Sequence, residues 1–280
     1  MTTASHPGLD REWAQARYGP WVVIAGGSDG TGEAYARQLA ELGLNILLVA
    51  RRQAVLETLA AELRDQHGVE TRVLVQDLMA PEAAENMLKA SADLDVGLYI
   101  SNAGIDGTGA KFFEQPVDRW RRMINMNVVT VTEAVHGFGN RLLRRGHGGL
   151  LIMCSGSGLG GTPFLSMYSA TKGFEILLTE ALWGELSQSD IDVLGVVAPA
   201  MDTPFFRRSI AGQDFKLGGL IFTADHVARE ALAKLGHQPL IMFPTARRPP
   251  PEQVLEARFE ELQHSLEAGR SFFPKGEKEE

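Results

Sequence analysis

Seven short runs rich in valine, isoleucine and leucine recur along the chain, and a longer amphipathic stretch separates most of them from the next. Short apolar runs of this kind are typical of strands buried on both faces. The predicted strands are Trp21–Ala25, Ile46–Ala50, Arg72–Gln76, Val96–Ile100, Leu150–Cys154, Val193–Val197 and Leu240–Phe243. The predicted helices are Gly32–Leu42, Ala54–Gln66, Glu82–Ala90, Pro116–Arg145, Phe174–Ser187 and Ala224–Leu235. Because right-handed crossovers between parallel strands put helices on both faces, this order predicts an α/β protein with a Rossmann fold and a doubly wound, seven-stranded parallel sheet.

The length and composition indicate one folded unit. A chain of 280 residues with 44% hydrophobic residues can bury one large core, and no internal repeat or low-complexity linker divides it. We therefore expect a single Rossmann-type domain over residues 1–280. The charged end of the chain predicts a disordered C-terminal tail from about residue 274.

Charge and cysteine content exclude several classes of partner. The net charge of -8 argues against nucleic acid, because a phosphate backbone requires a basic surface. The single cysteine, Cys154, cannot form an internal disulfide, and no cysteine or histidine group has zinc-site spacing, so no metal is expected. The N-terminal region lacks the apolar stretch of a signal peptide, and no run is long enough to span a membrane. We expect a cytoplasmic protein with no membrane span.

A glycine-rich loop directly follows the first predicted strand. It reads Ala-Gly-Gly-Ser-Asp-Gly-Thr-Gly over residues 25–32, and a helix is predicted to follow it. Glycines there permit a tight turn and let the backbone approach a pyrophosphate, which the helix N-terminus binds. The loop residues expected to bind a dinucleotide are Gly26, Ser28, Asp29, Gly30, Thr31 and Gly32. An ordinary glycine turn and the G-x-S-x-G elbow of a serine hydrolase, with Ser28 as nucleophile, are the alternatives, although no earlier strand loop is present to form an oxyanion hole.

The end of the second predicted strand indicates which dinucleotide binds. An acidic residue at this place would bind the ribose 2′-hydroxyl of NAD, but the chain has Ala50 there, followed by Arg51 and Arg52. Planar guanidinium groups suit a 2′-phosphate, so NADP(H) is preferred over NAD(H). The same arginines could instead begin a solvated helix. Asp77 and Leu78 follow the third strand, where Asp77 could accept from the adenine amine or cap a helix.

Tyr168 and Lys172 lie four residues apart in a stretch predicted to be helical, so they share one helix face. A phenol with an ordinary pKa of about 10 is a poor base near neutral pH, and an adjacent ammonium lowers that pKa. Ser155 ends the fifth predicted strand, where its hydroxyl could polarise a carbonyl or could form a serine turn in its own loop. The pattern indicates proton-transfer chemistry on a carbonyl or alcohol.

With these residues in place, the sequence resembles the classical short-chain dehydrogenase/reductase family over about residues 21–203. The glycine loop matches the family's TGxxxGxG motif, and residues 101–104 match its NNAG motif. The family's catalytic tetrad corresponds to Asn127, Ser155, Tyr168 and Lys172. The resemblance implies that Tyr168 donates or accepts the proton, that Ser155 orients the substrate oxygen, and that Lys172 holds the nicotinamide ribose and lowers the tyrosine pKa. It implies that Asn127 holds a relay water.

The resemblance adds cofactor contacts beyond the glycine loop. These are Asn102, Ala103, Gly104, Tyr168, Lys172, Pro199, Ala200, Met201 and Thr203. Three positions depart from the family pattern, because Ala25 replaces a threonine, Ser101 an asparagine, and Ala200 the glycine that usually follows the proline. A methyl at Ala200 could shift the loop that passes the nicotinamide or narrow the pocket.

Three segments, Arg17–Trp21, Gly32–Ala36 and Leu48–Arg52, are similar to the branch of 17β-hydroxysteroid dehydrogenases and 3-oxoacyl-CoA reductases. That branch implies NADPH and a bulky apolar ketone, steroid-like or with an acyl chain. A substrate lid is expected around residues 204–222, with Phe205, Phe206 and Phe215 on it, although this stretch could simply pack on the core. The family also implies a homodimer or homotetramer through Pro116–Arg145 and Phe174–Ser187.

Together these features predict one catalytic domain of an NADP(H)-dependent oxidoreductase that transfers a hydride between nicotinamide and a ketone or secondary alcohol. A non-catalytic dinucleotide sensor and a serine hydrolase using Ser28 are the alternative functions.

Overall fold

The computed structural model describes residues 10–104, 109–201, 203, 207, 221–244 and 249–272, and for residues 261, 262 and 264–272 the backbone alone. Within this part of the chain, one parallel sheet has the strand order β3-β2-β1-β4-β5-β6-β7. The strands are β1 (Trp21–Ala25), β2 (Asn45–Ala50), β3 (Thr71–Val75), β4 (Val96–Ser101), β5 (Gly148–Ser155), β6 (Ile191–Ala198) and β7 (Leu240–Met242). This confirms the predicted doubly wound, seven-stranded parallel sheet, and each predicted strand overlaps an observed one.

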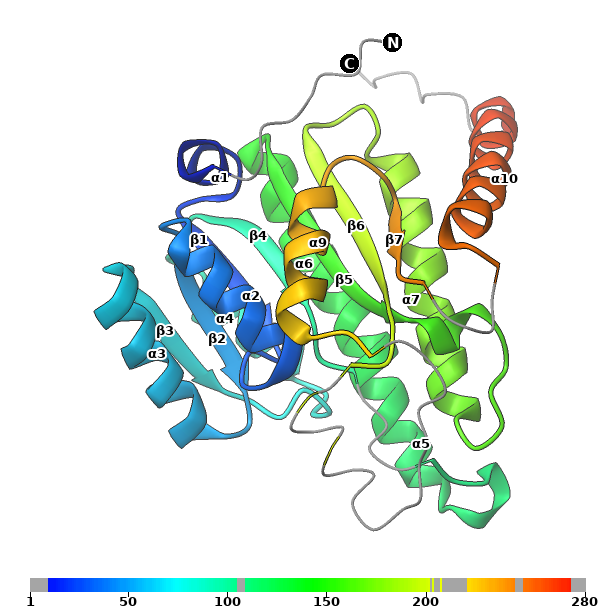
Figure 1. Cartoon of the computed structure of the whole chain (residues 1–280), viewed down its shortest axis with the longest axis horizontal. Coiled ribbons are helices and arrows are strands. Elements are labelled where there is room, and N and C mark those ends of the chain that lie inside the picture. The colour runs from blue at the N-terminus through cyan, green and yellow to red at the C-terminus, as the bar shows by residue number, and fades with distance from the viewer. Residues whose placement is uncertain are drawn as a thin grey trace, which may run out of the picture.

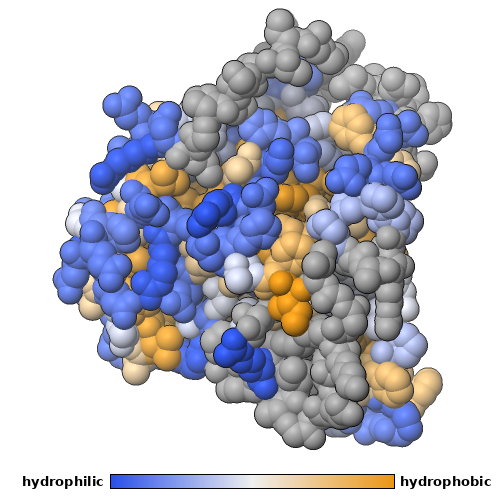
Figure 2. Space-filling model, in the orientation of Figure 1, coloured by the Kyte–Doolittle hydropathy of each residue, from blue (hydrophilic) through white to orange (hydrophobic). Residues whose placement is uncertain are grey.

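Helices cover both faces of the sheet (Figure 1). One face carries α2 (Gly30–Glu41), α3 (Gln53–His67) and α9 (Ala224–Lys234), and the other carries α4 (Ala83–Ala90), α6 (Val131–Arg145) and α7 (Ser166–Glu185). Alternate residues of β1 enter the two layers: Val22 and Ile24 join the first core, and Val23 and Ala25 join the second. Figure 2 shows that hydrophilic residues cover much of the described surface over α2 and α3.

Several elements differ from the sequence prediction. The predicted helix Pro116–Arg145 is divided into α5 (Val117–Ile124), a π-helical segment η2 (Asn125–Thr130) and α6. The helix expected from Phe174 begins at Ser166, so it also contains the stretch from Tyr168 to Lys172 that was predicted to be helical. Two short 3-10 segments, η1 (Phe112–Glu114) and η3 (Gly156–Leu159), were not predicted.

Two further helices were not predicted from the sequence. The helix α1 (Arg11–Tyr18) precedes β1, and α10 (Pro251–Phe272) packs on α7 through a pair of hydrogen bonds from Arg258 to Glu180, at 2.7 and 2.6 Å. None of the helices that the structure describes is long and apolar enough to cross a membrane.

The strand order reverses between β1 and β4, because the chain leaves β3 and returns to the other side of β1. In a doubly wound sheet, loops diverge at this switch point and leave a crevice beyond the carboxyl ends of the strands. The strands run so that these ends lie at the lower edge of the sheet in Figure 1. The amino ends lie at the opposite edge, beside α1.

Candidate active site

The loop after β1 turns sharply into α2 at the switch point. Gly26 has a φ of +92°, and a Cβ there would lie 2.8 Å from the Ala103 nitrogen. A Cβ at Gly32 would lie 2.0 Å from the Gly26 oxygen, so glycine lets the first turn of α2 approach the loop. These two close approaches leave bare backbone at the N-terminus of α2, which suits a pyrophosphate.

The loop after β4 is joined to this glycine loop. Asn102 donates from Nδ2 to the Gly26 oxygen at 2.9 Å and accepts at Oδ1 from the Thr31 hydroxyl at 2.7 Å. The backbone nitrogens of Asn102 and Ala103 donate to the Ala25 oxygen at 2.9 and 2.8 Å. The sequence predicted both loops as cofactor contacts, and the structure brings them together.

Arg52, beyond the end of β2, reaches the glycine loop. Its Nη2 donates to the Ser28 carbonyl at 2.9 Å and to the Ser28 hydroxyl at 3.2 Å, and it lies 3.2 Å from Asp29 Oδ2. Arg51 is exposed, and Ala50 is buried at the end of the strand. Two cationic side chains therefore lie where the predicted 2′-phosphate site would be. A guanidinium cannot take a proton from Ser28, so this contact gives the serine no general base.

Asp77 takes part in a local turn after β3. Its Oδ1 accepts from the Met79 nitrogen at 3.1 Å, and its Oδ2 lies 3.7 Å from Arg122 Nη2. This is a turn within the loop and not the helix cap that the sequence left open, because the following helix α4 has Glu82 at its N-cap. One carboxylate oxygen of Asp77 faces Arg122. Leu78 is buried beside it, and its carbonyl accepts from the Thr130 hydroxyl at 3.1 Å.

The helix α7 places Lys172 one turn after Tyr168. Lys172 is 2% exposed, and its Nζ lies 5.9 Å from the centre of the Tyr168 ring, which is half-buried. The ammonium donates to the Met153 carbonyl at 2.7 Å and to the two Glu175 oxygens at 2.9 and 2.7 Å. Neither partner was named from the sequence.

Asn127 lies in η2, and its side chain enters the same site. Its Nδ2 donates to the Thr171 hydroxyl at 3.0 Å, and that hydroxyl donates to the Tyr168 carbonyl at 2.9 Å. Its Oδ1 is buried and has no hydrogen-bond partner among the described residues. A Cβ at Gly104 would lie 2.4 Å from Lys172 Nζ and 3.3 Å from this Oδ1. Glycine at this position therefore lets the loop after β4 pass close to both side chains.

Ser155 ends β5 and is buried at 9% exposure. Its Oγ accepts from the Ser157 nitrogen at 3.2 Å, which is the serine turn that the sequence left as an alternative. Accepting this bond leaves the hydroxyl proton available for donation to another oxygen. The turn and a substrate contact are therefore compatible.

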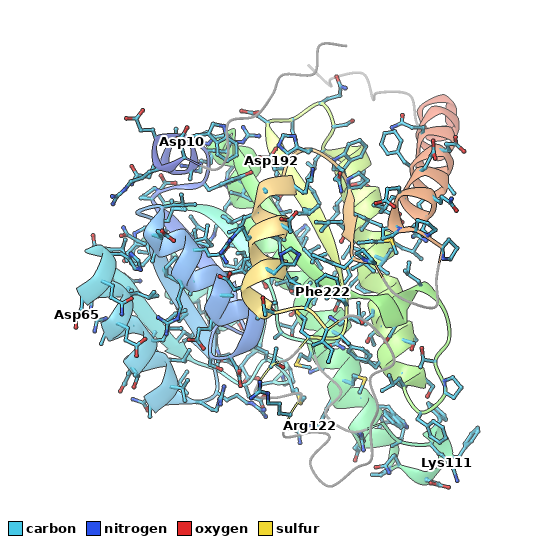
Figure 3. All side chains as sticks on the ribbon, in the orientation of Figure 1. Asp10, Asp65, Lys111, Arg122, Asp192 and Phe222 are labelled. Atoms are coloured by element: carbon cyan, nitrogen blue, oxygen red, sulfur yellow. The ribbon has the colours of Figure 1, made fainter. Side chains whose placement is uncertain are left out.

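The segment after β6 returns to the glycine loop. A Cβ at Gly30 would lie 3.1 Å from Thr203 Cγ2, so Thr203 lies against the start of α2. Ala200 is exposed and Pro199 is half-buried, and Met201 forms an isolated bridge with Phe222. The predicted lid residues Phe205, Phe206 and Phe215 lie outside the described residues, as does the predicted tail from 274. Figure 3 shows Phe222, at the end of the predicted lid.

The sequence analysis missed Glu175, which is 1% exposed. Burial raises the pKa of the Glu175 carboxyl to about 7, against the opposing attraction of Lys172. Burial also acts against the charge of Lys172, but the attraction of Glu175 outweighs it and keeps the pKa of Lys172 above its ordinary value. One signal was available: Glu175 is a carboxylate in the otherwise apolar stretch 174–178, one turn after the predicted lysine.

Comparisons with known proteins agree with this geometry. The family model for short chain dehydrogenases matches residues 20–214. The 7beta-hydroxysteroid dehydrogenase of Collinsella aerofaciens is 31% identical over 224 residues, which are 79% of this chain and 85% of that protein. The very-long-chain 3-oxoacyl-CoA reductase of Anas platyrhynchos is 32% identical over 183 residues, which are 64% of this chain and 59% of that protein. A solved short-chain dehydrogenase from Sphingobium yanoikuyae in complex with NADPH is similar with a TM-score of 0.75 and 28% identity, over 92% of this chain and 98% of that one.

Proposed function

Because this chain belongs to the short-chain dehydrogenase family and is an oxidoreductase of CH–OH groups, we propose that it transfers a hydride between NADP(H) and a bulky apolar ketone or its secondary alcohol. The observation that carries the proposal is the buried Lys172 ammonium 5.9 Å from the Tyr168 ring, at the same sheet edge as the Ser155 hydroxyl. A fixed positive charge beside a phenol stabilises its phenolate.

In the proposed reaction, the bound nicotinamide supplies or accepts the hydride. Tyr168 gives its hydroxyl proton to the substrate oxygen during reduction and takes it back during oxidation. Ser155 donates its free hydroxyl proton to the same oxygen and orients it. Lys172 lowers the pKa of the phenol by its charge. These donors are held by β5 and α7 before substrate arrives, so they need little rearrangement as negative charge develops on the oxygen.

The site also fits a nicotinamide dinucleotide. The close approaches at Gly26 and Gly32 leave the N-terminus of α2 open to the pyrophosphate, and the narrow passage at Gly104 brings the loop after β4 close to Lys172. The buried Asn127 Oδ1, which no described residue satisfies, would hold a water that relays protons beside Lys172. Lys172 would hold the nicotinamide ribose, and Thr203 would contact the carboxamide.

The preference for NADP(H) over NAD(H) rests on the end of β2. The chain has Ala50 in place of an acidic residue, and Arg51 and Arg52 follow it. Arg52 already donates to the glycine loop, which places its positive charge at the edge of the site. We expect NADPH to give at least a tenfold higher kcat/KM than NADH, since one charge-assisted contact contributes about 1.5 to 3 kcal/mol.

The relatives support the proposed substrate class. One is named for a hydroxysteroid and another for a very-long-chain 3-oxoacyl-CoA, and both the steroid nucleus and the long acyl chain are large and apolar. The end of the predicted lid is also apolar, because Phe222 packs edge-to-face on Phe243 at 5.3 Å between ring centres. The proposal therefore includes the lid and its aromatic residues Phe205, Phe206 and Phe215.

Three further parts of the proposal concern the whole protein. We propose one catalytic domain over residues 1–280 that associates as a homodimer or homotetramer. Exposed Val117, Leu143 and Leu177, at 58%, 49% and 63%, lie on helices that the sequence assigned to the interface and support this association. A reducing cytoplasm suits the lone, buried Cys154.

Turnover on a substrate panel tests the proposal. NADPH oxidation and NADP⁺ reduction would be followed with ketosteroids, 3-oxoacyl thioesters and aromatic ketones together with their alcohols. NADH and the Tyr168→Phe variant serve as controls. We expect NADPH-dependent turnover that is lost in Tyr168→Phe. Tight NADPH binding without turnover on any member would instead favour the sensor. Fluorophosphonate labelling that disappears in Ser28→Ala would favour the hydrolase.

A further inference from the structure

Glu175 is the strongest feature that the proposed chemistry does not yet use. It is a fully buried carboxylate on α7, three residues after Lys172, and both of its oxygens accept from the lysine ammonium. Its neighbours around the ammonium are the Met153 carbonyl of β5 and the backbone of Gly104. A buried carboxylate without a role is costly to keep, because charge separated from water must be compensated.

The ammonium has three hydrogens, and the chain itself supplies three acceptor atoms at 2.7 to 2.9 Å. Any further partner of Lys172 must therefore take a hydrogen from one of these acceptors. Because Glu175 uses two oxygens, it can release one bond and still keep the other. The pair can hold the lysine while leaving one donor available for the site.

Burial would otherwise remove the charge of Lys172. A fully buried ammonium without a counter-ion loses its proton at a much lower pH than one in water. The Glu175 carboxylate reverses this tendency and keeps the pKa of Lys172 above its ordinary value. Since the pKa of Glu175 is about 7, its carboxylate is ionised at the alkaline pH where Lys172 would otherwise be neutral.

Lys172 lies between Tyr168 and Glu175 along one face of α7, and it interacts electrostatically with both side chains. Its ammonium is 5.9 Å from the centre of the tyrosine ring and 2.7 Å from a Glu175 oxygen. The charge that acts on the phenol is therefore that of the ammonium, and the carboxylate acts on the ammonium. Among the residues that the structure describes, Cys154 of β5 also faces the pair, and burial raises its pKa far above the ordinary value, so the thiol is neutral. Further along α7, Glu180 is paired with Arg258 of α10.

We propose that Glu175 is a positioning residue for this enzyme: its buried carboxylate keeps the Lys172 ammonium charged and holds it at the base of the site, from where the lysine acts on Tyr168. The inference rests on the proposed function. It assigns no contact between Glu175 and substrate or cofactor. The effect of Glu175 on the reaction passes through Lys172 alone.

The test compares Glu175→Gln with Glu180→Gln. Glu180 is a matched control, because it is also a mostly buried carboxylate of α7 with two hydrogen bonds to one basic side chain, at 2.7 and 2.6 Å. The first readout needs no cofactor: lysine Cε is labelled with ¹³C, the Lys172 signal is assigned with Lys172→Arg, and the signal is followed against pH. The second readout is kcat for alcohol oxidation between pH 6 and pH 9.

We expect Lys172 of the native protein and of Glu180→Gln to remain charged to at least the ordinary lysine pKa of about 10.4. In Glu175→Gln the signal should titrate at least about one unit lower, because burial is no longer opposed. The ratio of native to Glu175→Gln activity should then rise from pH 6 to pH 9, because only the variant loses charged Lys172 in this range: a fall of about one pKa unit raises the ratio about 1.3-fold at pH 9, and a fall of about 2.5 units raises it about tenfold. Glu175→Asp, which keeps the charge, should restore most of the native pH profile.

An unchanged Lys172 titration in Glu175→Gln, or a loss that is equal at all pH values and shared by Glu180→Gln, would overturn the inference. If Glu175→Gln does not fold, the same question is put to the native protein, with ¹³C labels on the Glu175 carboxyl carbon and on Lys172 Cε. We expect each signal to shift when the other group titrates. Two independent titrations would overturn the inference. The Tyr168→Phe variant distinguishes a failure of the proposed function from a failure of the inference about Glu175. If that variant keeps full turnover, the proposed function fails; if it is inactive while Glu175→Gln behaves as native, only the role of Glu175 fails.

Discussion

The two edges of the sheet both carry an ion pair with two close hydrogen bonds. At the amino edge, Asp192 at the start of β6 accepts from Arg17 Nε and Nη2, both at 2.8 Å, and from the Tyr18 hydroxyl at 2.7 Å. At the carboxyl edge, Glu175 accepts from Lys172. Figure 3 shows Asp192 and Arg122 toward these opposite edges.

The two ion pairs differ in whether the polar groups beside them have unused hydrogen-bond donors or acceptors. Asp192 joins α1 to β6 with both oxygens engaged, so the contact holds the fold together. Beside Lys172, the buried Asn127 Oδ1 has no partner among the described residues, and the Ser155 hydroxyl has a proton that is free for donation. Similar charge pairs thus serve different ends: a network with its bonds satisfied stabilises the fold, and one with unused donors and acceptors can bind a ligand.

The largest expected effect is a loss of activity, and it distinguishes Tyr168, beside Lys172, from Tyr18, beside Asp192. Tyr168→Phe should lower kcat by about 10² to 10⁴, because it removes the proposed proton donor, while the free energy of unfolding changes little. Tyr18→Phe should keep kcat but lower the free energy of unfolding by about 2 kcal/mol, because it removes a hydrogen bond to a carboxylate. Steady-state kinetics and urea unfolding measure both. A stability loss in Tyr168→Phe equal to that of Tyr18→Phe would remove the distinction.

The second prediction concerns the ion pair between Arg17 and Asp192 at the amino edge of the sheet. Asp192→Asn should lower the free energy of unfolding by about 3 kcal/mol, because it leaves the mostly buried guanidinium of Arg17 without its main counter-ion. Activity at a temperature where both proteins are folded should be unchanged. Denaturant unfolding with parallel assays measures it, and a large fall in kcat of the folded variant would show that the amino edge is coupled to the site.

The third prediction crowds the carboxyl edge without changing charge. In Gly104→Ala the new methyl would lie 2.4 Å from Lys172 Nζ, so the ammonium must move. A displacement of about 1 Å can cost about 10² in rate, and we expect a fall of that size in kcat. Gly139→Ala in α6 is the control, because its methyl makes an ordinary 3.7 Å contact with Leu150. Equal activities of the two variants would contradict the expected crowding.

The smallest effect concerns pH and stability. The pKa of Glu175 is raised from 4.5 to about 7 in the folded protein, so its contribution to stability is fully present below pH 4.5 and is lost as the pH rises through 7. One proton gives a slope of at most about 1.4 kcal/mol per pH unit, and this slope should be absent in Glu175→Gln. Urea unfolding from pH 4.5 to pH 8 measures it.

The amino edge should show the opposite sign. The hydrogen bond from Arg17 lowers the pKa of Asp190, so the contribution of Asp190 to stability is present above the ordinary pKa of 3.8 and is lost as the pH falls further.

For Glu175, plots of unfolding free energy against pH that are parallel for the native protein and Glu175→Gln between pH 4.5 and pH 8 would contradict the expected titration.

Much of the fold and part of the candidate site could be predicted from local patterns. The strand runs, the glycine loop after the first of them and the spacing of Tyr168 and Lys172 are properties of neighbouring residues, and hydrophobic periodicity reports them directly. The helix α1 was missed because it is short and polar and is held by Asp192, about 175 positions away. The division of the long predicted helix by η2 was missed because residues 117–131 contain no glycine or proline, and the backbone stays helical at both junctions, so no local signal marks the change.

By itself, the sequence determined the seven-stranded alternation and the residue types at the carboxyl edge, because both depend on local periodicity and on short motifs. Only the tertiary structure decided that the Lys172 ammonium meets Glu175 and Met153, that Gly104 passes beside it, and that Asn127 Oδ1 is left without a partner among the described residues. These contacts join β4, β5, η2 and α7, which come together only when the sheet forms. Burial and hydrogen-bond satisfaction are properties of that assembled arrangement, so no local pattern could state them.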